Sequence, residues 1–174
     1  KNPYMSPFDE MQRWKQHPII KQYLEGGKRL SYGARALLKG GINALPKLTF
    51  AGGCLIGDDA GFLNFAKIKG SHTAMKSGML CAEAVFEAIK AGRANDEVTE
   101  YTDKFKNSWL YEELYASRSF GAAMHRMGTL MGGGYNWIDQ NLMGSKSPLT
   151  IRDTMPDHKM LDLAARSYKP TYPK

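Results

Sequence analysis

The stretch Leu48-Thr-Phe-Ala-Gly-Gly-Cys-Leu-Ile-Gly-Asp-Asp-Ala-Gly-Phe62 decides the fold, together with Lys69-Gly-Ser-His-Thr-Ala-Met-Lys-Ser-Gly78 downstream. Its first residues, as far as about Ile56, predict a strand that delivers a Gly-Asp pair and a glycine-containing loop. A helix is predicted over Ser71 to Ile89, and Gly92 ends it. The apolar residues at helical spacing are Met75, Met79, Ala82, Val85, Phe86 and Ile89.

Each part of this unit has a chemical use. Gly57 lets the backbone approach a ligand closely, and the Asp58 carboxylate can accept hydrogen bonds from ribityl-type hydroxyl groups. The helix start at Gly70 to Ala74 presents free N–H groups and a partial positive charge, which suit the negative N1/C2=O edge of a reduced flavin. Taken singly, Gly57-Asp58 is an ordinary turn and Ser71 an ordinary helix cap. Their combined order favours a flavin-binding unit.

The other segments predict a mixed fold, α/β or α+β. Ser6-Pro7 predicts a helix start, Pro18 interrupts that helix, and a second helix runs from about Ile19 to Leu24 before Gly26-Gly27. A further strand is predicted around Arg29 to Ala36. A long helix is predicted from Asp96 to about Ser117, with a broad face formed by Val98, Tyr101, Phe105, Trp109 and Tyr115.

Composition narrows the function classes. The 174 residues are 43% hydrophobic and carry a net charge of +7, which predicts a globular chain with an anionic partner. Nucleic acid, an anionic membrane surface, a phosphorylated cofactor or an acidic protein all satisfy that charge. The two cysteines, Cys54 and Cys81, are too few for a four-thiolate cluster or zinc site, so no metal ligand set is assigned to this chain.

Specific motifs extend beyond the flavin-type unit, and through them the sequence resembles the electron transfer flavoprotein–ubiquinone oxidoreductase family. The most specific is Lys67-Ile-Lys-Gly-Ser-His-Thr-Ala-Met-Lys-Ser-Gly78. The resemblance is dense over about residues 1–120 and looser beyond. Other matching stretches are Asn2-Pro-Tyr4, Ser6-Pro-Phe8, Gln12-Arg-Trp-Lys15, Gly26-Gly-Lys-Arg29, Tyr32-Gly-Ala-Arg-Ala-Leu37, Pro46-Lys-Leu-Thr-Phe50, Leu55-Ile-Gly57 and Lys106-Asn-Ser-Trp109.

The resemblance implies a flavoprotein oxidoreductase that takes electrons from reduced electron transfer flavoprotein and passes them to ubiquinone. It implies FAD and one [4Fe–4S] cluster as cofactors, in a two-dinucleotide-binding-domain type of FAD fold with quinone-binding and ferredoxin-like parts. The expected location is monotopic, on the bacterial or mitochondrial inner membrane. The expected partners are electron transfer flavoprotein, ubiquinone and the membrane surface, and no nucleic acid.

The same resemblance divides the chain into four regions. Residues 1–47 are expected on the quinone or substrate side, and 48–93 form the carboxy-terminal half of the FAD-binding domain. Residues 94–144 form a helical region. Residues 145–174, rich in proline, form an extended connection toward a ferredoxin-like domain.

FAD contacts are carried over residue by residue, and the resemblance assigns no catalytic residue. Asp58 departs from relatives that lack an acid there, and Ala66 and Cys81 also look atypical. The best FAD contacts are Gly57, Asp58, Gly70, Thr73 and Ala74, with Asn64 and His72 as second choices because they can serve loop structure instead.

Two family features lie outside the 174 residues. The amino-terminal GxGxxG phosphate-binding turn is missing, since Gly26-Gly27 and Gly132-Gly-Gly134 lack a strand–turn–helix context. The four cluster cysteines are missing too. We therefore expect an internal portion of a longer polypeptide that alone binds FAD poorly and transfers no electrons.

Residues 118–134 predict a membrane-surface helix that ends at Gly132-Gly-Gly134. His125 and Arg126 project away from its apolar face, toward anionic headgroups. An ordinary core-facing helix is the alternative, and the family resemblance favours the membrane. The predicted membrane-facing residues are Phe120, Met124, Met127, Leu130 and Met131, aided by Ala123 and by Tyr135 and Trp137 at the interface.

Two other functions remain open at this point. One is a related FAD-dependent reductase or hydroxylase, which would carry GxGxxG upstream but no four-cysteine module downstream. The other is a membrane-associated interaction module without a cofactor, which would be colourless when purified. His17, His125 and His158 are interpreted as satisfied or solvated, and the basic stretch around Lys28 and Arg35 as a solvated face.

Overall fold

The computed structural model describes residues 2–172 and divides the chain into two compact units. The first unit is built from the two ends of the chain, up to Ala34 and from Thr154 onward. It contains α1 (Pro7–Lys15), α2 (Pro18–Leu24) and the short 3₁₀ turns η2 (Asp157–Lys159) and η3 (Ala164–Arg166). Both α-helices begin at a proline, because the missing N–H of proline costs nothing in a first turn. This was predicted for α1, whereas α2 starts at Pro18 itself, one residue before the predicted Ile19.

Polar contacts join the two ends within this first unit. The Ser6 hydroxyl accepts a hydrogen bond from the Asp9 N–H at 3.2 Å and so caps α1. The Ser6 N–H donates to the hydroxyl of Tyr172, and the Asn2 amide donates to the Tyr168 carbonyl at 2.7 Å. Phe8 packs edge-on against Tyr32.

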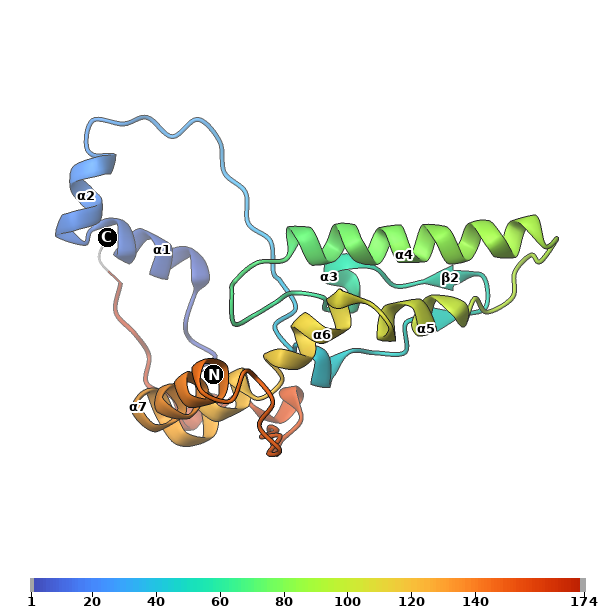
Figure 1. Ribbon diagram of the computed structural model, residues 1–174. Helices are drawn as coiled ribbons and strands as arrows, with labels where there is room; N and C mark the ends of the chain where they lie inside the picture. The colour runs from blue at the N-terminus through green and yellow to red at the C-terminus, as the bar shows by residue number, and fades with distance from the viewer. Residues whose placement is uncertain (1, 173–174) are drawn as a thin grey trace. The chain divides into compact units, whose positions relative to one another are not determined.

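The second unit, Arg35–Asp153, holds the hydrophobic core. Its longest straight element, α4, runs alongside α5 and over α3 (Figure 1). The core is formed by Leu48, Phe62, Leu80, Val98, Tyr101, Phe105, Leu110 and Leu114 with three small alanines. The elements are η1 (Ile42–Ala44), β1 (Thr49–Phe50), β2 (Gly53–Cys54), α3 (Gly57–Ala60), α4 (Ser71–Lys90), α5 (Glu100–Lys106), α6 (Trp109–Ala116) and α7 (Phe120–Asn141).

The fold is mixed α+β, as predicted, but with less strand than expected. The strand predicted over Leu48 to Ile56 is a tight antiparallel hairpin in which Thr49 pairs with Cys54. The strand predicted over Arg29 to Ala36 is wrong, because that segment pairs with no strand among the described residues. The helix predicted from Asp96 to Ser117 is two helices, α5 and α6, separated at Asn107-Ser108.

The extent of α4 was predicted correctly, and the structure shows which of its faces is buried. Met75, Met79, Phe86 and Ile89, the large apolar residues at helical spacing, are 57–67% exposed. Small residues allow closer approach to α3 and α5 than the large ones would. The face that packs consists of Thr73, Ser77, Leu80, Ala84 and Ala88.

The α7 segment is a helical hairpin, and the prediction that it would end at Gly132-Gly-Gly134 is wrong. The chain turns at Gly128, whose φ of 72° and ψ of −177° are non-helical. The Asn136 amide donates to the Phe120 carbonyl 16 residues earlier, at 3.1 Å. In an unbroken helix those residues would stand about 24 Å apart. The two halves of α7 therefore fold back on each other, with buried Gly132 against the backbone of Ala123.

Candidate flavin-contacting site

Gly57, which follows the β-hairpin, is held in place by residues of α4. Gly57 is buried and has a φ of 57°, which a residue with a side chain would adopt only under strain. Its N–H donates to the hydroxyl of Ser77 at 2.9 Å, and that hydroxyl donates onward to the Ala74 carbonyl at 2.7 Å. A Cβ at position 57 would touch the Cβ of Ala74 at 3.4 Å. The structure thus brings together two predicted contact residues and adds Ser77, which sequence reasoning missed.

The start of α4 leaves its backbone donors available. Gly70 is the N-cap residue, and no side chain among the described residues caps this helix. The Thr73 side chain is fully buried and donates to the Gly70 carbonyl at 2.8 Å. Thr73 therefore stabilises the first turn, and the groups that remain for a ligand are the backbone N–H groups of that turn.

Asp58 lies in the first turn of α3, half-buried. Its Oδ1 accepts a hydrogen bond from the Leu38 N–H at 3.3 Å, while neighbouring Asp59 is exposed. The carboxylate thus keeps most of its acceptor capacity for hydroxyl groups. Contact of Gly57, Asp58, Gly70, Thr73 and Ala74 with FAD stays a prediction.

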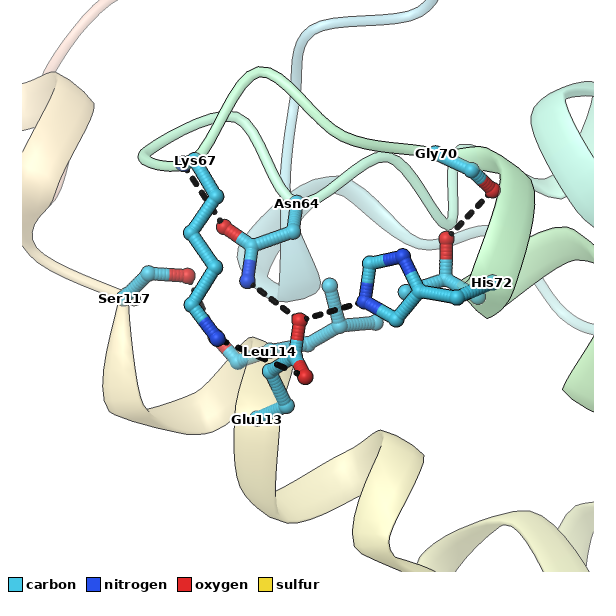
Figure 2. Close-up of polar contacts among 8 residues, drawn as sticks. Asn64, Lys67, Gly70, His72, Glu113, Leu114 and Ser117 are labelled. Carbon is cyan, nitrogen blue, oxygen red and sulfur yellow. Dashed lines mark hydrogen bonds and ion pairs between the residues drawn. The ribbon is translucent and has the colours of Figure 1, made fainter.

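Asn64 and His72, the second-choice contacts, converge on one carboxylate that sequence reasoning missed (Figure 2). Oε1 of Glu113, on α6, accepts hydrogen bonds from Asn64 Nδ2 at 2.7 Å and from His72 Nε2 at 2.8 Å. Its Oε2 lies 3.6 Å from the Lys67 ammonium. The His72 ring stacks on Trp109, with centroids 6.0 Å apart. The two residues thus have a structural partner of their own.

Electrostatics keeps Glu113 ionised. Burial alone would raise its pKa, but the hydrogen bonds from His72 and Asn64 and the charge of Lys67 outweigh burial and lower the pKa below its ordinary value. A cavity of about 450 Å³ opens beside the carboxylate and is lined in part by Asn64, Trp109 and Glu113. No local motif signals this cluster, since Glu113 lies 41 residues beyond His72.

The two cysteines lie against each other, Cys54 on β2 and Cys81 on α4. Burial and the hydrogen bond that the Cys81 thiol donates to Cys54 raise the pKa of Cys81 to about 11, so it stays protonated at neutral pH. Both are free, and two thiols do not fit the four ligands of a [4Fe–4S] cluster. This chain therefore cannot hold such a cluster by itself.

The predicted membrane-facing residues divide between the two halves of the α7 hairpin. Before the turn, Phe120, Met124 and Met127 are half-buried and Ala123 is fully buried. After it, Leu130 is 90% and Met131 72% exposed. Further exposed apolar residues, which sequence reasoning missed or assigned only to the interface, are Trp137, Ile138, Leu142 and Met143. Within residues 2–172, no helix combines the length and apolarity needed to cross a bilayer.

The chain is similar to known proteins over almost its whole length. Residues 1–37 match the family model described as "ETF-QO, ubiquinone-binding". The chain is 61% identical to a probable electron transfer flavoprotein-ubiquinone oxidoreductase of Acinetobacter baylyi, an alignment that covers 99% of the chain and 33% of the relative. The chain belongs to the electron transfer flavoprotein–ubiquinone oxidoreductase family.

Other family members are similar along the same stretch. The Pseudomonas aeruginosa protein is 61% identical, over 99% of the chain and 32% of the relative. The human mitochondrial protein is 46% identical, over 99% of the chain and 29% of the relative. The chain thus spans about a third of the length of the curated relatives that it matches. The unit boundary at Ala34 lies close to the end of the ubiquinone-binding match at residue 37.

Proposed function

We propose that the chain is the flavin- and quinone-side portion of an oxidoreductase that passes electrons from reduced electron transfer flavoprotein to ubiquinone at an inner membrane. The observation that carries this proposal is the joined unit of buried Gly57 and the uncapped start of α4, held together through Ser77. Relatives that are 61% identical over 99% of the chain are named electron transfer flavoprotein-ubiquinone oxidoreductases. FAD, when bound, supplies the ring that accepts and releases the electrons.

The residues present fit an FAD edge. In this proposal Gly57 and the small Ala74 give the backbone room for close approach, and the φ of 57° at Gly57 favours glycine there. The free N–H groups of the first turn of α4 stabilise negative charge on the reduced ring. The Asp58 carboxylate accepts from ribityl-type hydroxyls. The phosphate-binding half of the FAD domain and the four cluster cysteines belong to the other two thirds of the family's length.

The adjacent pair Asp58 and Asp59 provides the test. The full-length polypeptide should purify with FAD and reduce ubiquinone when given reduced electron transfer flavoprotein. Asp58→Asn should raise the FAD dissociation constant roughly tenfold, the size expected when one hydrogen bond to a charged group is weakened. Asp59→Asn is the matched control and should leave it unchanged, because that side chain is exposed. A colourless wild-type polypeptide, or equal effects of the two variants, would contradict the proposed site.

Membrane attachment is assigned in this proposal to the second half of α7. Its exposed Leu130, Met131 and Trp137 suit the interface between headgroups and acyl chains, while exposed Arg126 suits anionic headgroups. Leu130→Glu together with Met131→Glu should therefore reduce flotation of the full-length polypeptide with phosphatidylglycerol-containing vesicles. Thr129→Glu is the control, because it adds a charge at an exposed polar position. Equal flotation of wild type, the double variant and Thr129→Glu would contradict the assignment of α7 to the membrane surface.

A further inference from the structure

Glu113 is the one carboxylate in Figure 2, and it is bound by both ends of the segment that leads into α4. Asn64 stands at the start of this segment and His72 in the first turn of α4, and both donate to the same Oε1, at 2.7 and 2.8 Å. Lys67, in the middle of the segment, has its ammonium 3.6 Å from the other carboxylate oxygen, Oε2. A residue of α6 thus sets the distance between the two ends of the segment.

The shape of this segment depends on such support. The backbones of Asn64 and Lys69 pair in an antiparallel bridge, and the Asn64 side chain accepts from the Lys67 N–H at 3.2 Å. Ile68 has a φ of 54°, which is a genuine outlier for a β-branched residue, and its side chain is exposed. Such a conformation persists only where surrounding contacts fix it. Asn64, tied to Glu113, supplies several of those contacts.

We propose that Glu113 is a positioning residue of the flavin site, which holds the segment 64–72 and places a negative charge behind the first turn of α4. This inference rests on the proposed function, since that turn is the assigned contact of the flavin. Two consequences follow. Without the carboxylate the segment is anchored less firmly, so FAD binds more weakly in both redox states. The reduced, anionic flavin loses less affinity than the oxidised flavin, because a like charge near it has been removed.

The test uses the full-length polypeptide with bound FAD. Glu113→Gln keeps an oxygen that can accept from Asn64 but removes the charge. We expect the affinity for oxidised FAD to fall about tenfold relative to that for reduced FAD, which corresponds to an increase of ~30 mV in the two-electron midpoint potential. Glu112→Gln is the matched control, because Glu112 is the exposed neighbour on the same helix. It should leave the potential unchanged.

A second variant separates electrostatic placement from loss of fold. Lys67→Met removes the opposite charge and leaves both Oε1 hydrogen bonds in place, so the midpoint potential should fall instead of rise. A purely structural role for the cluster would not reverse the sign. If wild type holds FAD and Asp58→Asn releases it, but neither Glu113→Gln nor Lys67→Met moves the potential, Glu113 has no role at the flavin and the proposed function stands. A wild-type polypeptide without FAD overturns both.

Discussion

Gly132→Ala should open the α7 hairpin. A Cβ at position 132 would lie 2.5 Å from the Ala123 carbonyl oxygen and 2.9 Å from the Met124 Cα, where ordinary contact begins near 3.4 Å. Both obstacles are backbone atoms, which cannot rotate away. The two halves of α7 must therefore separate by about 1 Å, since packed interiors hold no spare volume. That movement strains the hydrogen bond from Asn136 to the Phe120 carbonyl.

The magnitude follows from three terms. Overpacking costs about 1–3 kcal/mol, and a weakened hydrogen bond adds up to about 1 kcal/mol. Alanine in place of glycine returns about 1 kcal/mol of helix propensity. The net loss is about 2 kcal/mol, which for a chain of this size lowers the melting temperature by roughly 4–8 °C. In Gly134→Ala only the propensity term remains, because no described atom lies within 4 Å of the added Cβ. It should raise the melting temperature by roughly 2–4 °C.

Thermal unfolding followed by circular dichroism at 222 nm compares Gly132→Ala with Gly134→Ala and wild type. The two substitutions are chemically identical and lie two residues apart in one glycine run, so differences in the unfolded state cancel. Opposite signs are expected. If Gly132→Ala is as stable as wild type, or if both variants lose stability equally, the halves of α7 do not pack through Gly132 and the hairpin is wrong.

Three further predictions concern the core and the site. Ser77→Ala should cost about 1–2 kcal/mol in the free energy of unfolding, because it leaves the buried Gly57 N–H without its acceptor; urea unfolding measures this, with exposed Ser71→Ala as control. Tyr101→Phe should cost about 1 kcal/mol in the same assay, since the buried hydroxyl donates to the Leu55 carbonyl at 3.1 Å. The lowered pKa of Glu113 contributes stability that is complete above the ordinary value of 4.5 and is lost as the pH falls through the folded value. Urea midpoints between pH 6 and 3 should therefore fall less steeply for Glu113→Gln than for wild type, and parallel curves would contradict that contribution.

The parts of the fold that could be predicted are those with local causes. The proline at the first turn of α1 and of α2 determines where each helix begins. The extent of α4 follows from its apolar periodicity and from Gly92 behind it. The predictions that failed concern segments whose structure depends on a distant part of the chain that packs or pairs with them. Arg29 to Ala36 was predicted as a strand, but a strand exists only where another strand pairs with it.

The candidate site likewise contains residues that a local motif identifies and residues that only tertiary packing brings together. Gly57, Asp58 and the first turn of α4 lie in one motif, so a single pass along the sequence finds them. Ser77 shares that motif, but its contact with Gly57 spans 20 residues and depends on how α4 packs. Glu113 is more distant still and belongs to a different helix. Hydrogen bonds of this kind follow from tertiary packing, which periodicity does not encode.

The two faces of α4 show that periodicity identifies an apolar face of a helix but does not tell which face packs against the core. Met75, Met79, Phe86 and Ile89 follow each other at intervals of three, four or seven residues along the helix, which is the pattern of a buried stripe, yet all four are exposed. Within the described residues, the opposite face of α4 packs into the core instead. Its alanines and serine let α5 and α3 approach, and Ser77 can reach Gly57 only because this face is turned inward. Had the large residues packed inward, the hydroxyl would point away from the glycine turn. The small-residue face of α4 is therefore what assembles the proposed flavin contact.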